Sequence, residues 1–248
     1  MPAVFVHGNP EDHTLWDEVR AELGDAPSVA VNLPGFGIPI PDGFDASKDS
    51  YLAWLIAELE KIGEPVDLVG HDWGAILSSR VIATRPDLLR TWAIDALSMH
   101  VPGAQWHAVA KIWQTPGAGE QWMERQDSVD DATRMAGLMA VGMPERYARK
   151  MAKIDPLRND CILKLYRSAT NVFEEWRWTE PLKRPGLHLG GSRDPYAPAK
   201  AGTAIAEQFG GIDEAVLEDA GHWWALDQPA QAAAALRTFW TKTNTLSS

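Results

Sequence analysis

Residues 65–75 read Pro-Val-Asp-Leu-Val-Gly-His-Asp-Trp-Gly-Ala, and this stretch decides the fold. The apolar run that ends at Gly70 predicts a buried strand, and residues 75–84 predict a helix. Gly70 and Gly74 bracket the turn between these elements and permit a sharp bend, which presents the side chain of Asp72 above the sheet. A strand, a tight turn and a helix in this order favour a reactive role for Asp72 over a purely structural turn.

The same alternation of strand and helix runs through both ends of the chain. Strands are predicted at residues 3–7, from residue 28, and at 65–70, 91–96, 186–191 and 215–218. Helices are predicted at residues 15–23, 52–59, 75–84, 198–209 and 229–240, and the residues after Thr241 are expected to fray. Strands that alternate with helices predict an α/β fold, with a parallel sheet covered by helices on both faces.

Residues 97–182 interrupt this pattern with helix-like stretches that contain five tryptophans and no convincing strand. A segment of this length in a compact domain needs structure of its own, so a helical cap insertion is expected. The core would then consist of residues 1–96 and 183–248. The tryptophans either line an apolar pocket over Asp72 or anchor the short cap helices by packing.

Composition excludes several classes of function. The 248 residues include 23 Lys and Arg against 34 Asp and Glu, a formal net charge of −11, so a nucleic-acid partner is not expected. No apolar run is long enough for a membrane span, and the start of the chain lacks the features of a secretion signal. The single cysteine, Cys161, excludes an internal disulfide and fits a reducing cytoplasm. No motif indicates a metal or a cofactor, so none is expected.

Two further segments can complete a reactive centre around Asp72. A carboxylate that attacks a saturated carbon with a good leaving group forms an ester, whose hydrolysis needs a water, a base and an acid that orients the base. Asp194 follows a predicted strand, and His222 lies on the loop before the last helix. The chain order Asp72, Asp194, His222 is therefore nucleophile, acid and base. Asp95, after the strand that leads into the cap, is a second candidate for the acid.

On these motifs the chain resembles the alpha/beta hydrolases of the group that contains haloalkane dehalogenases and epoxide hydrolases. The resemblance covers nearly the whole chain and rests on residues 7–10, 33–37, 70–74, 114–120 and 165–167 and on the Asp194 and His222 loops. It implies an α/β-hydrolase fold with a mostly parallel sheet and an inserted helical cap. Family members usually begin with two more antiparallel strands, which are expected to be missing here.

The resemblance also assigns the groups that hold the leaving group. In haloalkane dehalogenases an Asn after His-Gly and a Trp after the nucleophile clamp the departing halide, and Asn9 and Trp73 match both. Their backbone N–H groups would hold the oxyanion when water attacks the ester. In epoxide hydrolases two cap tyrosines protonate the ring oxygen; Tyr166 matches one of them, and no Tyr stands where the other is expected.

The sequence therefore predicts a hydrolase that cleaves a carbon–halogen bond of a small apolar substrate through an alkyl ester on Asp72, with water as the second reactant. The alternative is an epoxide hydrolase that uses the same Asp72, His222 and Asp194, with Tyr166 as the acid for the ring oxygen. A binding protein without catalytic activity on the same fold is less favoured.

Overall fold

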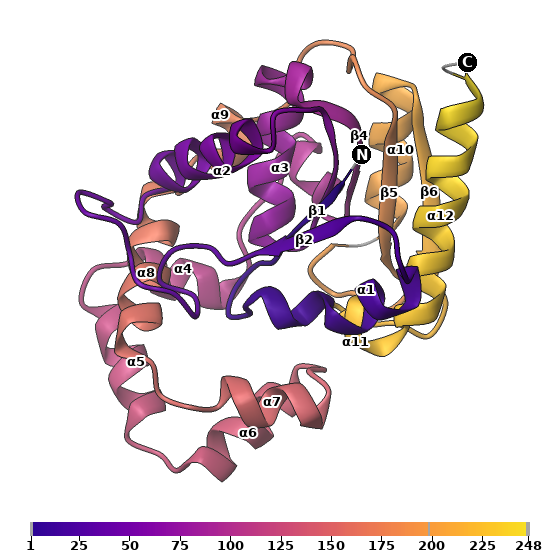
Figure 1. The fold of residues 1–248 in the computed structure, drawn as a ribbon. Coiled ribbons are helices and arrows are strands. Elements are labelled where there is room, and N and C mark those ends of the chain that lie inside the picture. Colours follow the sequence, from indigo (N-terminus) through magenta and orange to yellow (C-terminus); the bar gives the residue numbers. More distant parts are fainter. Residues whose placement is uncertain (1, 198, 247–248) are drawn as a thin grey trace.

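A computed structural model describes residues 2–197 and 199–246, which fold around one six-stranded sheet (Figure 1). The strands lie in the order β2-β1-β3-β4-β5-β6, and every pairing is parallel. Their bounds are β1 Ala3–Val6, β2 Ser28–Val31, β3 Val66–Gly70, β4 Leu89–Ile94, β5 Gly186–Gly191 and β6 Ile212–Leu217. The predicted fold class is confirmed. The carboxyl ends of the parallel strands meet at one edge, where the sites of α/β proteins form.

Helices cover both faces of the sheet because successive side chains of each strand point to opposite sides. In β1, Ala3 and Phe5 pack in one apolar cluster, and Val4 and Val6 pack in the other. The first cluster includes residues of α1 (Asp17–Leu23), α11 (Trp224–Asp227) and α12 (Pro229–Leu246). The second includes residues of α2 (Lys48–Ile62), α3 (Trp73–Thr84) and α10 (Ala199–Phe209). The four inner strands β1, β3, β4 and β5 are therefore buried on both sides, whereas the edge strands β2 and β6 are partly exposed.

Helix α12 differs from its prediction, because it continues to Leu246 instead of fraying after Thr241. Its last turns are held to the sheet by polar contacts. The ammonium group of Lys242 lies 2.7 Å from both carboxylate oxygens of Asp213 at the start of β6, and Arg90 on β4 donates to the side chain of Asn244. These contacts join elements that are distant in the sequence, so local propensity could not indicate them.

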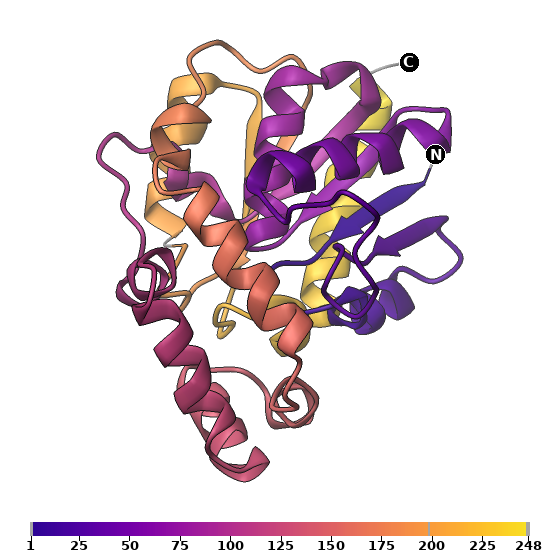
Figure 2. The same ribbon diagram turned by 90° about the vertical axis from the view of Figure 1, so that its left-hand side faces the viewer.

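Residues 97–182, here called the cap segment, contain no strand and carry six helices, with a 3-10 helix (Ala96–His100) at their start. The helices are α4 (Ala108–Gln114), α5 (Ala118–Asp127), α6 (Asp131–Ala140), α7 (Glu145–Met151), α8 (Pro156–Ser168) and α9 (Val172–Glu175). Figures 1 and 2 show α5 and α6 extending away from the sheet as an arm, whereas buried residues of α7 join the apolar cluster of α1 and α11. Lys150 of α7 returns to the core, where its ammonium group lies 2.6 Å from the Asp12 carboxylate.

The two connections of the cap segment to the core meet at one point. The imidazole of His100, at its start, stacks on the indole of Trp178, near its end, with ring centroids 3.8 Å apart. The Trp178 indole N–H also donates to the backbone oxygen of Ser79 in α3 at 3.0 Å. Entry and exit of the cap segment are thus fastened to each other and to the helix that follows Asp72.

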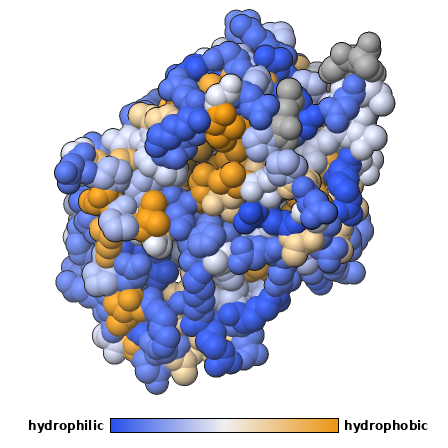
Figure 3. Space-filling view, in the orientation of Figure 1, coloured by the Kyte–Doolittle hydropathy of each residue, from blue (hydrophilic) through white to orange (hydrophobic). Residues whose placement is uncertain are grey.

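The surface in the orientation of Figure 1 is mostly hydrophilic, with apolar patches separated by polar residues (Figure 3). Large apolar side chains that are exposed include Met139 in α6, Val141 directly after it and Ile154 shortly after α7. None of the helices in residues 2–197 and 199–246 has both the length and the apolar character needed to cross a membrane.

The turn from β3 into α3 depends on a close approach of two backbones. A Cβ atom added to Gly74 would lie 2.2 Å from the carbonyl oxygen of Val6 and 2.6 Å from that of His7. The backbone N–H of His71 donates to the same Val6 oxygen at 3.0 Å. Any side chain at position 74 would force α3 away from β1, so glycine is required there.

Replacing Gly74 by Ala is expected to destabilise the protein by about 3 kcal/mol or more, because backbone atoms cannot yield as a flexible side chain would. Gly137 in α6 is the matched control. A Cβ there would meet no atom within 4 Å, so G137A should gain about 0.5 to 1 kcal/mol from better helix propensity. Denaturant unfolding of both variants measures the difference. Equal stability of the two variants would contradict the backbone contact.

Candidate active site

Asp72 stands at the turn between β3 and α3 with a strained backbone, φ 50° and ψ −120°. The strain is held by contacts on both sides. The backbone N–H of Asp72 donates to Oδ1 of Asp95 at 3.1 Å, and Oδ1 of Asp72 accepts from the backbone N–H of Asn9 at 2.8 Å. Gly8 makes room for this carboxylate, since a Cβ there would lie 2.2 Å from Asp72 Oδ1. One carboxylate oxygen, Oδ1, is therefore fixed in place.

His222 and Asp194 lie next to Asp72, on the loops that precede α11 and follow β5. Nδ1 of His222 is 2.8 Å from Oδ2 of Asp194, and Nε2 of His222 is 3.8 Å from Oδ2 of Asp72. The other Asp194 oxygen accepts the backbone N–H groups of Tyr196 at 2.7 Å and Ala197 at 3.2 Å. The structure thus brings together the three residues expected from the sequence, with the imidazole between two carboxylates.

The charges of this trio are interdependent. Burial by itself would lower the pKa of His222, but the hydrogen bond to Asp194 and the nearby carboxylates outweigh it and raise the pKa above its usual value. Burial would raise the pKa of Asp194, but the same hydrogen bond and the two backbone donors lower it. The pair therefore favours an ionised Asp194, which fixes the orientation of the imidazole.

Asp95 does not contact His222. Its Oδ2 lies 2.5 Å from Nδ1 of His71 and accepts the indole N–H of Trp224 at 2.8 Å. Its other oxygen accepts the N–H of Asp72. The two acids considered from the sequence are thus at different histidines, and Asp194 is the one on His222.

A second group of polar atoms lies near Asp72. The side-chain amide of Asn9 donates toward the hydroxyl of Tyr166 at 3.4 Å, and both residues are buried. The indole N–H of Trp73, which is also fully buried, makes no well-formed hydrogen bond with a described residue, although it lies close enough to the Tyr166 hydroxyl to lower the pKa of that group. Burial raises the pKa of Tyr166 well above its usual value, so its hydroxyl stays protonated.

Aromatic rings from the cap segment pack against these core residues. The indole of Trp106 stacks on Trp73 with centroids 5.5 Å apart and lies 5.0 Å from the Tyr166 ring. Trp113 approaches the same Tyr166 ring at 4.9 Å. These tryptophans therefore anchor the cap segment on Trp73, the residue after Asp72, and on Tyr166.

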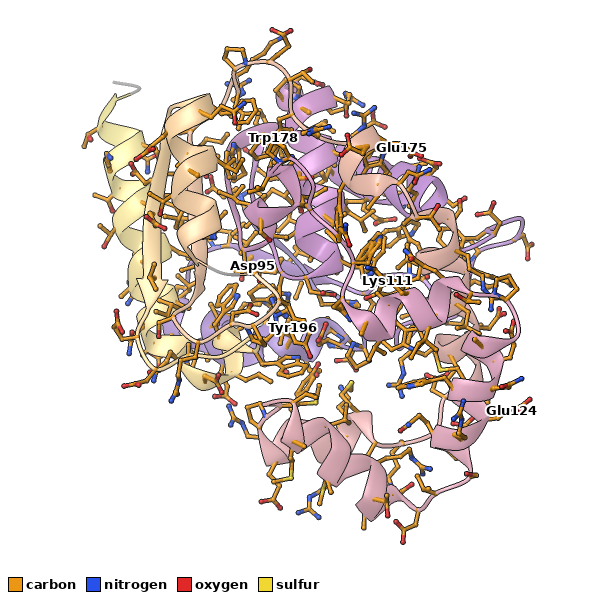
Figure 4. The ribbon with its side chains drawn as sticks, turned by 180° about the vertical axis from the view of Figure 1, so that it is seen from behind. Asp95, Lys111, Glu124, Glu175, Trp178 and Tyr196 are labelled. Carbon is orange, nitrogen blue, oxygen red and sulfur yellow. The ribbon has the colours of Figure 1, made fainter. Side chains whose placement is uncertain are left out.

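Three further residues at the site were not picked out by the sequence analysis. The ring of Tyr196 lies 4.9 Å from that of His222, and Figure 4 shows Tyr196 at the edge of the core that faces the cap segment. His71 and Glu11 are buried below the site, beside Asp95 and Trp223. The sequence contains a signal for His71 and Glu11, because both are ionisable and each lies in or next to one of the motifs described above. Among the described residues, no three His, Cys, Asp or Glu side chains are grouped so as to bind a metal ion.

Comparison with known proteins identifies the family to which this fold belongs. The sequence profile of the alpha/beta hydrolase family matches residues 3–236. The chain belongs to the alpha/beta hydrolase family. In solved structures the fold matches a loop variant of a haloalkane dehalogenase from Bradyrhizobium elkanii, with a TM-score of 0.72 and 17% identity over 99% of this chain and 91% of that one.

Curated relatives of this alpha/beta hydrolase have different activities. An (E)-2-((N-methylformamido)methylene)succinate hydrolase of Acinetobacter baylyi is 23% identical, over 98% of this chain and 90% of its own. A haloalkane dehalogenase of Mycolicibacterium paratuberculosis is 26% identical, over 78% and 68%. The bifunctional epoxide hydrolase 2 of Rattus norvegicus is 23% identical over 93% of this chain, which spans only half of that protein. The relatives support a hydrolase and leave its substrate open.

Replacing Asp194 by Asn should lower the pKa of His222, because burial then dominates once the neighbouring negative charge is gone. The pKa should fall below about 6.5, the value of an unperturbed imidazole. Titration of the imidazole signals by NMR measures it. The matched control is D219N, which removes an exposed carboxylate near the same loop and should leave the His222 titration in place. An unchanged His222 pKa in D194N would show that Asp194 does not govern this imidazole.

Proposed function

We propose that this alpha/beta hydrolase opens a carbon–halogen bond of a small apolar substrate through an alkyl ester on Asp72. The support is that Asn9 fixes Oδ1, so Oδ2 is the oxygen available for attack. In the first step Oδ2 bonds to the carbon, and the halide leaves with the electron pair of the broken bond. Such a displacement needs no cofactor.

The observation that carries the choice of halide is that two buried donors, the indole N–H of Trp73 and the side-chain amide of Asn9, have no acceptor beyond the Tyr166 hydroxyl among the described residues. A buried donor without an acceptor costs free energy, so its retention favours a ligand that accepts. A departing halide is an anion that accepts N–H donors and takes no proton. The two side chains match that need.

The second step releases the product. His222 takes a proton from water, the water oxygen adds to Cγ of Asp72, and the alcohol leaves as the carboxylate re-forms. The backbone N–H groups of Asn9 and Trp73 hold the oxyanion that forms between water attack and release of the alcohol. Asp194 stabilises the imidazolium while it carries the proton. The sum is alkyl halide plus water giving alcohol, proton and halide.

Residues 97–182 act in this proposal as a cap domain over a core of residues 1–96 and 183–248. Trp106 and Trp113 would shield the reacting atoms from water, which strengthens the N–H donors on the halide. A cytoplasmic location stays a prediction from the single cysteine.

An epoxide hydrolase is the second candidate, favoured by one observation. The Tyr166 hydroxyl, kept protonated by burial, lies in the same group as Asn9 and could donate a proton to an epoxide oxygen. A screen for halide release and diol formation with small haloalkanes and epoxides separates the two. Turnover of esters or amides alone would contradict both, because attack by Asp72 on an acyl carbon would give an anhydride. Specific binding with no turnover of any substrate would favour a binding protein without catalytic activity.

Replacing His222 by Gln should trap the alkyl ester, because the base is needed only after the ester has formed. Intact-protein mass spectrometry after incubation with a substrate should show the mass of the added alkyl group. The double variant D72A/H222Q is the control and should stay unmodified. An unmodified mass for H222Q with a substrate that the wild type turns over would contradict His222 as the base.

The two leaving groups demand different donors, so two variants distinguish them. For a halide, N9A should lose about 2 to 4 kcal/mol of transition-state stabilisation, and Y166F should lose less. For an epoxide the order reverses, because an alkoxide needs a proton that N–H groups do not provide. The measurement is kcat/KM of each variant on the best bromoalkane and the best epoxide. A larger loss for Y166F on the preferred substrate would overturn the assignment of halide.

A further inference from the structure

A second imidazole and carboxylate pair lies directly below the proposed catalytic trio. His71 and Asp95 are each 1% exposed, and Nδ1 of His71 is 2.5 Å from Oδ2 of Asp95. Figure 4 places Asp95 in the core, on the same side as Tyr196. Neither residue takes a chemical step in the proposed mechanism. A buried ion pair is costly unless it is well paired, so its presence here calls for a function.

The pair touches two members of the trio. Asp95 accepts the backbone N–H of Asp72 at 3.1 Å, where the backbone is strained. The ring of His71 lies 4.6 Å from the ring of His222, closer to it than any other ring. The Trp224 indole N–H, at 2.8 Å from Asp95 Oδ2, gives this carboxylate a third donor. Asp95 is thus held as an acceptor, and His71 is the member of the pair nearer to His222.

We propose that His71 and Asp95 are positioning residues: Asp95 holds His71 as an imidazolium, whose charge opposes protonation of His222, the base of the proposed mechanism. Only the reference to base catalysis rests on the proposed function. The charge arrangement itself stands independently of any substrate.

The groups around the two imidazoles agree with this assignment. His71 is faced by Asp95, Asp72, Glu11, His7 and His222. Burial would lower the pKa of His71, but the charge and hydrogen bond of Asp95 outweigh it and raise the pKa to about 10. The pKa of His7 is lowered by burial to about 4, so it adds no charge at neutral pH. His71 therefore stays charged through the neutral range.

His222 is faced by groups of both signs: Asp194, Asp72, His71, Glu11 and His107. Asp194 and Asp72 raise the pKa of His222, and the His71 charge lowers it. Burial raises the pKa of Glu11, whose Oε1 accepts the Trp223 indole N–H at 2.7 Å. Without the His71 charge, the two aspartates would hold His222 protonated to higher pH and remove the base.

The test is an NMR titration of the imidazole nitrogens in protein labelled with 15N-histidine. The chain has only 7 His, so single substitutions assign each signal. In the wild type, both His71 nitrogens should stay protonated between about pH 6 and about pH 9. In D95N, His71 should become neutral in that range, and the His222 pKa should rise by about one unit or more. This rise is opposite to the fall expected for D194N.

H71Q removes the same charge by another route and keeps an N–H donor for Asp95. It leaves the Asp95 carboxylate unneutralised, so the His222 pKa should rise further than in D95N. The matched control is H13Q, which removes an imidazole that hydrogen-bonds Asn32 and should leave the His222 titration unmoved. If one variant does not fold, the other decides the proposal alone.

A neutral His71 in the wild type at neutral pH, or an unchanged or lowered His222 pKa in the folded variants, would overturn the proposal. With a substrate in hand, the acidic limb of the pH dependence of ester hydrolysis should move to higher pH in both variants. If no substrate is found but the titrations follow the expected pattern, the proposed function fails and the charge pair stands.

Discussion

The contact between the start of α3 and the end of β1 is the constraint on which the rest of the site depends. Gly74 packs on the Val6 carbonyl, and this contact sets the depth at which Asp72 enters the sheet edge. The loop after β1 then supplies the N–H of Asn9 to the Asp72 carboxylate. Asn9, Asp95 and His222 all lie close to Asp72, so their positions relative to it depend on this contact. The site therefore requires glycine at two positions: Gly74, at this contact, and Gly8, which makes room for the Asp72 carboxylate.

The sequence predicted the parallel sheet, the sharp turn at Asp72 and the loops of Asp194 and His222, because each of these has a local signal. It favoured Asp194 as the acid and kept Asp95 as a second candidate, since both follow strands that end at the same sheet edge. That choice depends on which loop reaches His222, and the tight turn from Gly191 to Asp194 settles the geometry. The length of α12 was also missed, because contacts with distant strands determine it.

Five ionisable side chains, each less than a tenth exposed, lie together below the cap segment: Glu11, His71, Asp95, Asp194 and His222. Such a cluster is stable only where each charge has a partner, and two histidine and aspartate pairs provide most of the pairing. Tryptophan N–H groups donate to two of the carboxylates, one in each case. Some tryptophans therefore donate hydrogen bonds to buried carboxylates in addition to packing in the apolar core. Removing one partner leaves an unpaired buried charge, so stability and charge state change together at this site.

The stacked pair of His100 and Trp178 closes the base of the cap segment, and β4 and β5, which flank it, are neighbours in the sheet. With respect to the core, residues 97–182 therefore behave as one loop whose two ends are adjacent. The entropy of closing such a loop grows only with the logarithm of its length. An inserted segment of a different length at this place would therefore change the entropy of loop closure only slightly. The sheet and the turn at Asp72 need not change when the segment between β4 and β5 does.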